Sequence, residues 1–510
     1  MSDLIEILRN PIKWHSASSD PDIKLFLEDL QANILKGHGR HHAAHVFIGF
    51  DDLSHDAVAH VVRALGRRCT SAAEQLRSNK RYAPYLDGGT VRCVFLSAGG
   101  FEALGAHAEV PPGAAFAAGM AARQAILSDP GRATWEAGTW NARAPDAMLL
   151  IANADPRIVT GEAKAFAQWL EASGCRILAT ETGLQQTRKF RPDAAAEGVE
   201  HFGYVDGRSH PLFLDEDLRT ELAGLPEEPP APGGFSTGRI PWSPAFPPSQ
   251  FIVADPNGRL PLSAGSYFVF RKLEQDVRGF NAAEDALGEA LFGKAATQEE
   301  LDRAGAMVVG RFEDGTPLTD FPQGTAAAVP NGFTYENDAD GARCPFHAHI
   351  RKTNPRGDVR RQLNLPDDQG DRSPIMARRG ITYGPARPMS QDGSEFADGG
   401  NEPVHGSGLL FMAYMADLEQ QFEFTQQSWA NNPDFAGNIG ENKHGSTGID
   451  PVIGQADPAA PTREHTYLDG HTPGAQPSMH RFEQFVHMKG GEYFFAPSLS
   501  FLRGVGTASS

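Results

Sequence analysis

The chain has 510 residues, of which 40% are hydrophobic and 22% charged, as in ordinary globular proteins. Its formal charge of −18 excludes a sequence-independent electrostatic attraction to nucleic acid or to anionic membranes. Four scattered cysteines without a CxxC spacing argue against a disulfide framework or a structural zinc module. The N-terminus, MSDLIEILRNPIKW, has no basic stretch before an apolar run, and no stretch is apolar enough to span a bilayer. We therefore expect a cytoplasmic protein with small-molecule or protein partners.

Short strand-like runs alternate with helical patterns in the first half of the chain. In order these are AHVFIGF at 44–50, a helical pattern at 56–68, VRCVFLS at 91–97, AMLLIANAD at 147–155 and a second helical pattern at 162–173. This alternation predicts an α+β fold.

The stretch 225–250 separates two halves, because proline and glycine replace any periodic apolar pattern there. We predict an N-terminal domain at 1–224, a linker or surface crossover at 225–250 and a C-terminal domain at 251–510. In the second half, SYFVFRKL at 266–273 and LLFMAYM at 409–415 each precede a helical pattern. The same order of strand and helix in both halves suggests a duplicated α+β unit.

The sequence EHFGYVDGRSHP at 200–211 places Asp206 between two glycines. Glycine allows the backbone to approach a ligand closely, so this carboxylate could line a cavity. An ordinary Asp-Gly turn is the alternative explanation.

The sequence CPFHAHIRKTNPR at 344–356 combines two imidazoles with three cations. Cys344, His347 and His349 offer only three donors, and no second cluster completes a tetrahedral zinc site. A haem whose iron binds one imidazole, and whose two propionates pair with nearby cations, fits this composition better. Each histidine could instead be an ordinary hydrogen-bonded residue.

A third stretch, IMARRGITYGPAR at 375–387, places Arg378 and Arg379 before a glycine. Adjacent arginines are usually one solvated side chain and one that pairs with a carboxylate, so this stretch is uninformative alone.

Together these stretches resemble the dye-decolorizing peroxidase family. GYVDGR resembles its GxxDG motif, HIRKTNPR the segment with its proximal histidine, and RRGITYG the segment with its distal arginine. LQANILKGHGR at 30–40 is similar to QGNILKGxGR, with Ala32 in place of glycine, and segments at 411–435 and 490–498 also match in order.

The resemblance implies two ferredoxin-like domains with antiparallel sheets, of the dimeric α+β barrel type, and one haem b per chain held mainly by the C-terminal domain. It implies His349 as the axial iron ligand, Asp206 and Arg378 as the distal catalytic pair, and Arg351 as the propionate partner. It further implies that Leu409 and Phe411 line the distal side. Glu483 is our candidate for the carboxylate that accepts the axial imidazole NH.

The implied activity is a haem peroxidase that reduces hydrogen peroxide and oxidises phenols, dyes or similar donors through a ferryl state, with Mn(II) as a further donor. In this scheme Asp206 moves the peroxide proton and Arg378 stabilises the developing negative charge. The alternative is a haem-binding or haem-processing protein of the same fold with little peroxidase turnover. Whether the chain forms a homo-oligomer is left open.

Overall fold

The computed structural model describes residues 3–79, 88–191, 195–223, 241–325, 331–439, 444–455 and 463–507. Its N-terminal half contains one complete α+β unit. In chain order the unit consists of β1 (His42–Gly49), α3 (His55–Gly66), β2 (Val91–Leu96), β3 (Ala147–Asn153), α8 (Pro156–Ala172) and β4 (Arg176–Leu184). All neighbouring strands are antiparallel, in the order β4-β1-β3-β2, which is the ferredoxin-like arrangement.

The helices of this unit begin where the sequence supplies capping groups. The Ser54 side chain accepts a hydrogen bond from the Ala57 amide at the start of α3, and Asp155 accepts one from the Arg157 amide at the start of α8. Proline at the first position of α8 costs no hydrogen bond, because that amide has no partner within the helix.

The C-terminal half repeats this order around a longer central strand. Its main elements are β8 (Ala264–Gln275), α10 (Val277–Phe292), α11 (Gln298–Val309), β9 (Ala377–Arg378), β10 (Ile381–Tyr383), β11 (Gly408–Met415) and β14 (Val486–Ala496). The antiparallel order β10-β11-β8-β14 is again ferredoxin-like. The two ferredoxin-like units expected from the sequence are therefore present.

Single contacts between strands join the two units into one ten-stranded sheet. Leu96 of β2 pairs with Phe495 of β14, and Gly183 of β4 pairs with Tyr383 of β10. Because β8 and β11 also pair, the sheet closes on itself, and aromatic side chains such as Phe47 and Phe270 pack within it. Only glycine fits at 183, since a Cβ atom there would lie 2.5 Å from the Ile381 side chain.

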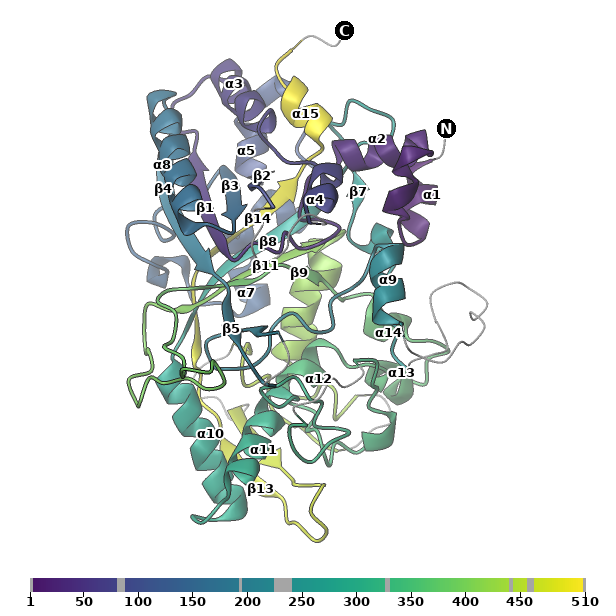
Figure 1. The fold of residues 1–510 in the computed structure, drawn as a ribbon, viewed down its shortest axis with the longest axis vertical. Helices are drawn as coiled ribbons and strands as arrows, with labels where there is room; N and C mark the ends of the chain where they lie inside the picture. The colour runs from purple at the N-terminus through teal and green to yellow at the C-terminus, as the bar shows by residue number, and fades with distance from the viewer. Residues whose placement is uncertain are drawn as a thin grey trace.

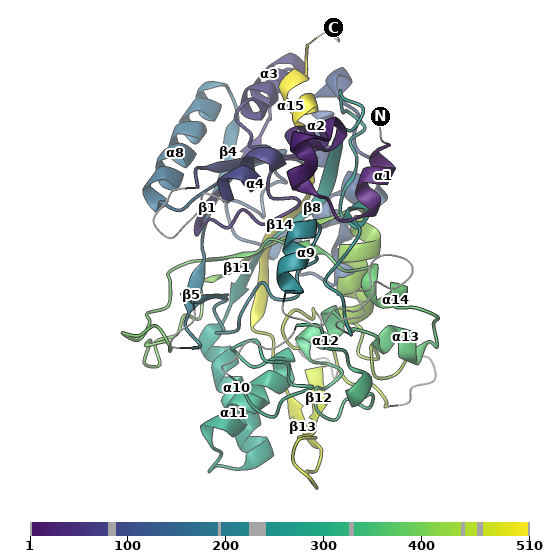
Figure 2. The ribbon, with the colours of Figure 1, turned by 45° about the vertical axis from the view of Figure 1, so that its right-hand side comes forward.

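The helices cover the two ends of this sheet. The views of Figures 1 and 2 place α3, α8 and α15 at one end, and α10, α11 and the β12–β13 hairpin at the other. The remaining helices are α1 (Leu4–Arg9), α2 (Pro21–Asp29), α4 (Ala72–Asn79), α5 (Ala98–Glu102), α6 (Ala114–Ala118), α7 (Gln124–Leu127), α9 (Asp215–Glu221), α12 (His349–Thr353), α13 (Asp358–Gln362), α14 (Gln369–Arg372) and α15 (Leu499–Gly504). The remaining strands are β5 (Gln186–Arg188), β6 (Glu197–Val199), β7 (Val253–Ala254), β12 (Glu464–Tyr467) and β13 (Ser478–Arg481).

The helical pattern after β11 has an unusual geometry. Leu418–Glu423 and Thr425–Ala430 are π-helical, and the Asp417 side chain caps the first of them. Phe424, between the two segments, packs against Trp429 in a small separate cluster.

The predicted linker lies largely outside the described residues, since its residues 225–240 are not among them. Its last part, 241–250, is described and includes Ala245, which bridges to Leu212. The domain boundaries at 224 and 251 stay a prediction. Across the described ranges, the longest apolar helical stretch falls short of what a membrane crossing requires.

Candidate active site

Asp206 lies on a loop fixed against strand β6. The Asp206 amide donates to the Gly198 carbonyl at 3.0 Å, and Val205 forms a bridge with Val199. Gly203 has a φ of 114°, and a Cβ atom there would lie 2.6 Å from Glu313 Oε1. The glycine-containing motif therefore presents Asp206 at a fixed position.

Arg378 faces Asp206 from the short strand β9. Arg378 Nη1 lies 3.6 Å from Asp206 Oδ1, and Arg378 Nη2 donates to the Arg208 carbonyl at 3.1 Å. The next side chain, Arg379, donates at 2.8 Å to the carbonyls of Asn33 and Ile34, in the segment that follows α2. The structure thus brings Asp206 together with the first arginine of the pair, while the second holds another segment in place.

A cavity of about 480 Å³ contains this pair. Leu409 and Phe411 also line it; they alternate along β11 with Leu410 and Met412, which point into the buried core. The four distal residues predicted from the sequence therefore line one cavity.

His349 begins helix α12 and pairs with a buried carboxylate. His349 Nδ1 lies 2.8 Å from Asp450 Oδ2, and Asp450 Oδ1 accepts hydrogen bonds from the amides of Val452 and Ile453 at 2.8 and 3.0 Å. Burial opposes ionisation of Asp450, but the His349 imidazole and the two amides outweigh it and lower the pKa of Asp450. No described residue hydrogen-bonds His349 Nε2, so this nitrogen is free to bind a metal.

The other candidate metal ligands of this segment, His347 and Cys344, have different environments from His349. His347 is buried, with its ring centroid 4.6 Å from those of both His465 and Tyr467, and burial lowers its pKa well below the usual value. Cys344 packs with Phe333 in a small apolar cluster. Within the described ranges, no set of three or more His, Cys, Asp or Glu side chains is disposed to hold a metal ion.

Two expectations from the sequence are wrong. Glu483 forms an exposed ion pair with Arg481 at 2.7 Å, so it does not accept the His349 NH; Asp450 does. Arg351 is fully buried between Asp358 at 2.7 Å and Asp338 at 3.0 Å. These two carboxylates already neutralise Arg351, which leaves it no role as a propionate partner.

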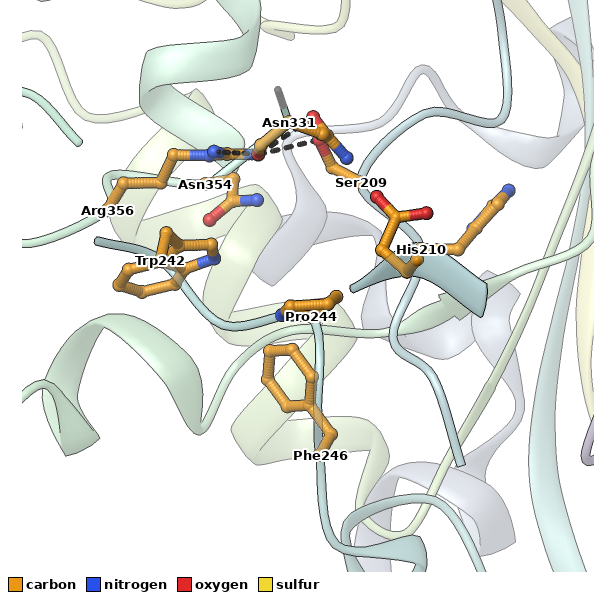
Figure 3. A pocket seen from close by; sticks show the side chains of 9 residues that line it. Ser209, His210, Trp242, Pro244, Phe246, Asn331, Asn354 and Arg356 are labelled. Atoms are coloured by element: carbon orange, nitrogen blue, oxygen red, sulfur yellow. Dashed lines mark hydrogen bonds between the residues drawn. The ribbon is translucent and has the colours of Figure 1, made fainter. Parts of the chain in front are cut away.

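Among the described residues, a second buried arginine of the same segment forms no ion pair with a carboxylate. Arg356 donates to Ser209 Oγ at 2.6 Å and to the carbonyls of Asn331 and Phe333, and its Nε atom has no partner. Figure 3 shows Arg356 directed at Ser209 and Asn331 beside a small pocket that Trp242 also lines.

Arg311 shares these partners. It donates to Ser209 Oγ at 2.9 Å and to Asn331 Oδ1 at 2.6 Å. Burial lowers the pKa of Arg356 to about 9 and that of Arg311 to about 10, and in each case neighbouring cations add to the effect. Neither forms an ion pair within the described residues, so this buried arginine pair fits an anionic group such as the propionates of a haem.

The buried arginine pair also connects the two sides of the site. Ser209 follows Arg208, whose carbonyl binds Arg378 on the distal side, while Arg356 lies in the segment that begins with His349. The distal loop and the imidazole segment therefore meet at the Ser209–Arg356 hydrogen bond. The chemistry of these groups suits a haem, because it includes an imidazole nitrogen and two cations without partners of these kinds among the described residues. Asp206 and Arg378 line the cavity, whereas His349, Arg311 and Arg356 are not among its lining residues.

Three functional residues were not assigned from the sequence. Asp450 lies 101 residues after His349, outside any recognised motif. Its setting in GIDPVIG, a carboxylate among apolar residues, is a signal that could have marked a buried partner. The sequence shows Arg356 only as one of three cations in its segment, and no recognised motif contains Arg311.

Known proteins resemble this chain in both sequence and fold. The chain is 39% identical over 511 residues to the multifunctional dye peroxidase DyP2 of Amycolatopsis sp., covering 98% of this chain and 99% of that protein. The solved structure of DyP2 matches with a TM-score of 0.82, and that of a DyP-type peroxidase from Anabaena sp. also with 0.82, at 33% identity over 98% of this chain and 99% of that one. A dye-decolorizing peroxidase of Auricularia auricula-judae is 34% identical over 318 residues, covering 60% of this chain and 56% of that protein.

No protein-family model matches the sequence. The identity to the Amycolatopsis enzyme nevertheless extends over nearly the full length of both chains, and the two structures share one fold. The chain belongs to the dye-decolorizing peroxidase family.

Proposed function

We propose that Asp206 and Arg378 are the distal catalytic pair and His349 the axial ligand of this haem peroxidase. Family membership makes the protein an enzyme that uses hydrogen peroxide and oxidises dyes and phenols. The observation that carries the proposal is the meeting of Asp206 and Arg378 in one cavity, from segments far apart in the chain. When bound, the haem supplies an iron centre that accepts oxidising equivalents from peroxide and passes them to donors singly.

Asp206 is placed to move the peroxide proton. Uneven cleavage of the O–O bond requires transfer of a proton from one peroxide oxygen to the other, and a carboxylate can accept and return it. Asp206 Oδ1 accepts a hydrogen bond from the Gly207 amide at 2.7 Å, which orients the side chain. The partial exposure of the carboxylate, 32%, leaves room for peroxide beside it.

Arg378 supplies a fixed positive charge to the same cavity. Because its Nη2 is held by the Arg208 carbonyl, the guanidinium keeps its orientation without peroxide. Preorganised charge of this kind stabilises the negative charge that develops on the leaving oxygen, with a contribution of about 10² to 10³ in rate.

Asp450 fixes which nitrogen of His349 would hold the haem iron. A carboxylate on Nδ1 holds the proton there, so the lone pair of Nε2 would be available to an iron. The negative charge of Asp450 would also raise the basicity of the imidazole toward the iron.

The cofactor we propose is haem b, one per chain, with Arg311 and Arg356 as the propionate partners in place of Arg351. Its two carboxylates match the two unneutralised guanidinium groups. A cytoplasmic location is supported by the four cysteines, which are all buried and free. Mn(II) as a further donor stays a prediction, and the oligomeric state stays open.

The test is the substitution Arg378→Leu, with Arg378→Lys as its charge-conserving match. We expect both variants to keep a full Soret band. For Arg378→Leu, kcat/KM for hydrogen peroxide should fall about 10²- to 10³-fold, and Arg378→Lys should recover part of this loss. His349→Ala should lose the Soret band itself. Wild-type turnover in Arg378→Leu would contradict the catalytic role of Arg378, whereas negligible peroxide turnover in the wild-type holoenzyme would favour the haem-binding alternative.

A further inference from the structure

The cavity around Asp206 and Arg378 has a buried floor and an exposed rim. Buried lining residues such as Asn33 and Phe213 form its floor, while Lys36 and Glu221 are exposed to solvent. An entering molecule meets the exposed rim before it reaches Asp206 and Arg378, so the rim is where selection by size can occur.

An ion pair spans the rim. Lys36 Nζ lies 2.6 Å from Asp217 Oδ1, and both residues line the cavity. Lys36 belongs to the segment after α2, whereas Asp217 lies 181 residues later on α9. The pair therefore connects two walls that share no other side-chain ion pair within the described ranges.

The wall that carries Lys36 has a fixed backbone. Gln75 Nε2 donates to the carbonyls of Lys36 and Gly37 at 2.9 and 3.0 Å, and Gln75 Oε1 accepts from the Asn33 amide. Arg379 holds the neighbouring carbonyls of Asn33 and Ile34. Movement at this side of the rim is thus confined to the Lys36 side chain.

The opposite wall is also fixed. At the start of α9, the Asp215 amide donates to the Ile12 carbonyl at 3.2 Å, and Leu218 is buried in the next turn. The charged groups between the walls are solvated, since the side chains of Lys36 and Asp217 are 43% and 26% exposed. Such exposed pairs are weak and screened by salt, so this contact can open and close without a change in the fold.

We propose that the Lys36–Asp217 ion pair is a gate that sets the size of the molecules reaching Asp206 and Arg378. Hydrogen peroxide passes the closed rim, whereas an aromatic donor or ligand passes only when the pair is broken. This inference rests on the proposed distal role of Asp206 and Arg378, and it makes Lys36 and Asp217 residues that determine specificity without taking part in the chemistry.

The first measurement follows ligand entry without turnover. In the ferric holoenzyme at about pH 8, where imidazole is mostly neutral, stopped-flow Soret shifts give the association rates of cyanide and of imidazole. We expect Lys36→Met and Asp217→Asn each to raise the imidazole rate about two- to fivefold and to leave the cyanide rate unchanged. Arg219→Met is the matched control, because it breaks the Arg219–Asp215 pair on the same helix outside the cavity.

The second measurement uses 2,6-dimethoxyphenol, a neutral donor. Both gate variants should raise kcat/KM for this phenol and leave kcat/KM for hydrogen peroxide unchanged. Added salt should raise the wild-type phenol value and have no effect in Lys36→Met. The double variant Lys36→Asp with Asp217→Lys restores an ion pair of reversed polarity. It should return the imidazole association rate and kcat/KM for 2,6-dimethoxyphenol to the wild-type values.

Each contrary outcome has a distinct meaning. Opposite effects of Lys36→Met and Asp217→Asn would show that net charge, not closure, controls entry, and would overturn the gate. Unchanged imidazole rates in both variants would also overturn it. Neither result would affect the distal assignment, which fails only if Arg378→Leu keeps its activity toward peroxide.

Discussion

The proximal and distal sides of the site treat their charged groups in opposite ways. On the proximal side, Asp450 is fully buried and its Oδ2 lies 2.8 Å from His349 Nδ1. Its other oxygen accepts hydrogen bonds from two backbone amides. On the distal side, Asp206 and Arg378 are 3.6 Å apart, with side chains 32% and 38% exposed. The partners of His349, the proposed iron ligand, are thus complete within the protein. Asp206 and Arg378 are left partly exposed, where a reactant must enter and leave.

Two arginines of one segment differ in the same way, since one has its charge neutralised within the protein and the other does not. Arg351 is neutralised within the protein by Asp338 and Asp358, and these carboxylates raise its pKa although burial alone would lower it. Arg356, five residues later, is equally buried but forms no ion pair in the part of the chain that the structure describes. A buried cation without a counter-ion is costly, so its presence indicates that an anionic ligand completes the site.

The largest effect that tests this contrast is expected for Asp206→Asn. Loss of the proton carrier should lower kcat/KM for hydrogen peroxide by about 10²- to 10⁴-fold. Because the Asp206–Arg378 pair is partly solvated, the free energy of unfolding should change by less than about 1 kcal/mol. Steady-state kinetics and denaturant titration measure the two quantities. A strongly destabilised variant would show that the distal pair is structural and that the two sides do not differ as described.

The next effect concerns Arg351→Met and Arg356→Met. Arg351→Met should lower the free energy of unfolding of the haem-free protein by about 3–5 kcal/mol, because Asp338 loses its ion pair and keeps only the Arg343 and Cys344 amides, while Asp358 keeps only Arg361 as an ionic partner. Arg356→Met leaves no carboxylate unpaired and should destabilise the protein less. Its main effect should be faster transfer of haem to a scavenging apoprotein, measured by loss of the Soret band. Equal stability losses with unchanged haem transfer would contradict the assignment of the propionate partner.

The fold was predictable because strands and helices leave local patterns. The runs at 44–50, 91–97, 147–155, 266–273 and 409–415 correspond to strands β1, β2, β3, β8 and β11. β4, Arg176–Leu184, was missed, because its mixture of charged, small and threonine residues has no regular apolar alternation. Patterns along the chain also cannot show that single pairs such as Gly183 with Tyr383 join the two units into one closed sheet.

The site was only partly predictable for a similar reason. Asp206, Arg378 and His349 lie in short motifs, whereas their partners come from other parts of the chain. Arg351 and Arg356 are the same residue type in the same motif, and only the carboxylates Asp338 and Asp358 distinguish them. Charge neutralisation is a property of the folded contacts, so the resemblance of the motif, which implied Arg351, could not show that Arg351 is neutralised within the protein.

The smallest effect is the pH dependence of stability that the proximal carboxylate contributes. The folded pKa of Asp450 is lowered, so the unfolded chain binds a proton at higher pH than the native protein. The stability from this group is therefore complete above the usual carboxyl pKa of about 4 and is lost as the pH falls further. Denaturant titrations between about pH 5 and pH 3 should show a shallower loss in Asp450→Asn than in the wild type.

Asp371 provides the matched control with the opposite sign. It is also buried and accepts backbone hydrogen bonds, from Gly357, Val359 and Arg360, but burial raises its pKa to about 6. Its native form binds a proton before the unfolded chain does, so its contribution increases as the pH falls from about 6 to about 4. Asp371→Asn should remove that increase and leave the acid loss below pH 4 intact. If both variants flatten the same pH range, the His349 contact does not set the ionisation of Asp450, and the proximal side is less completely neutralised than its geometry indicates.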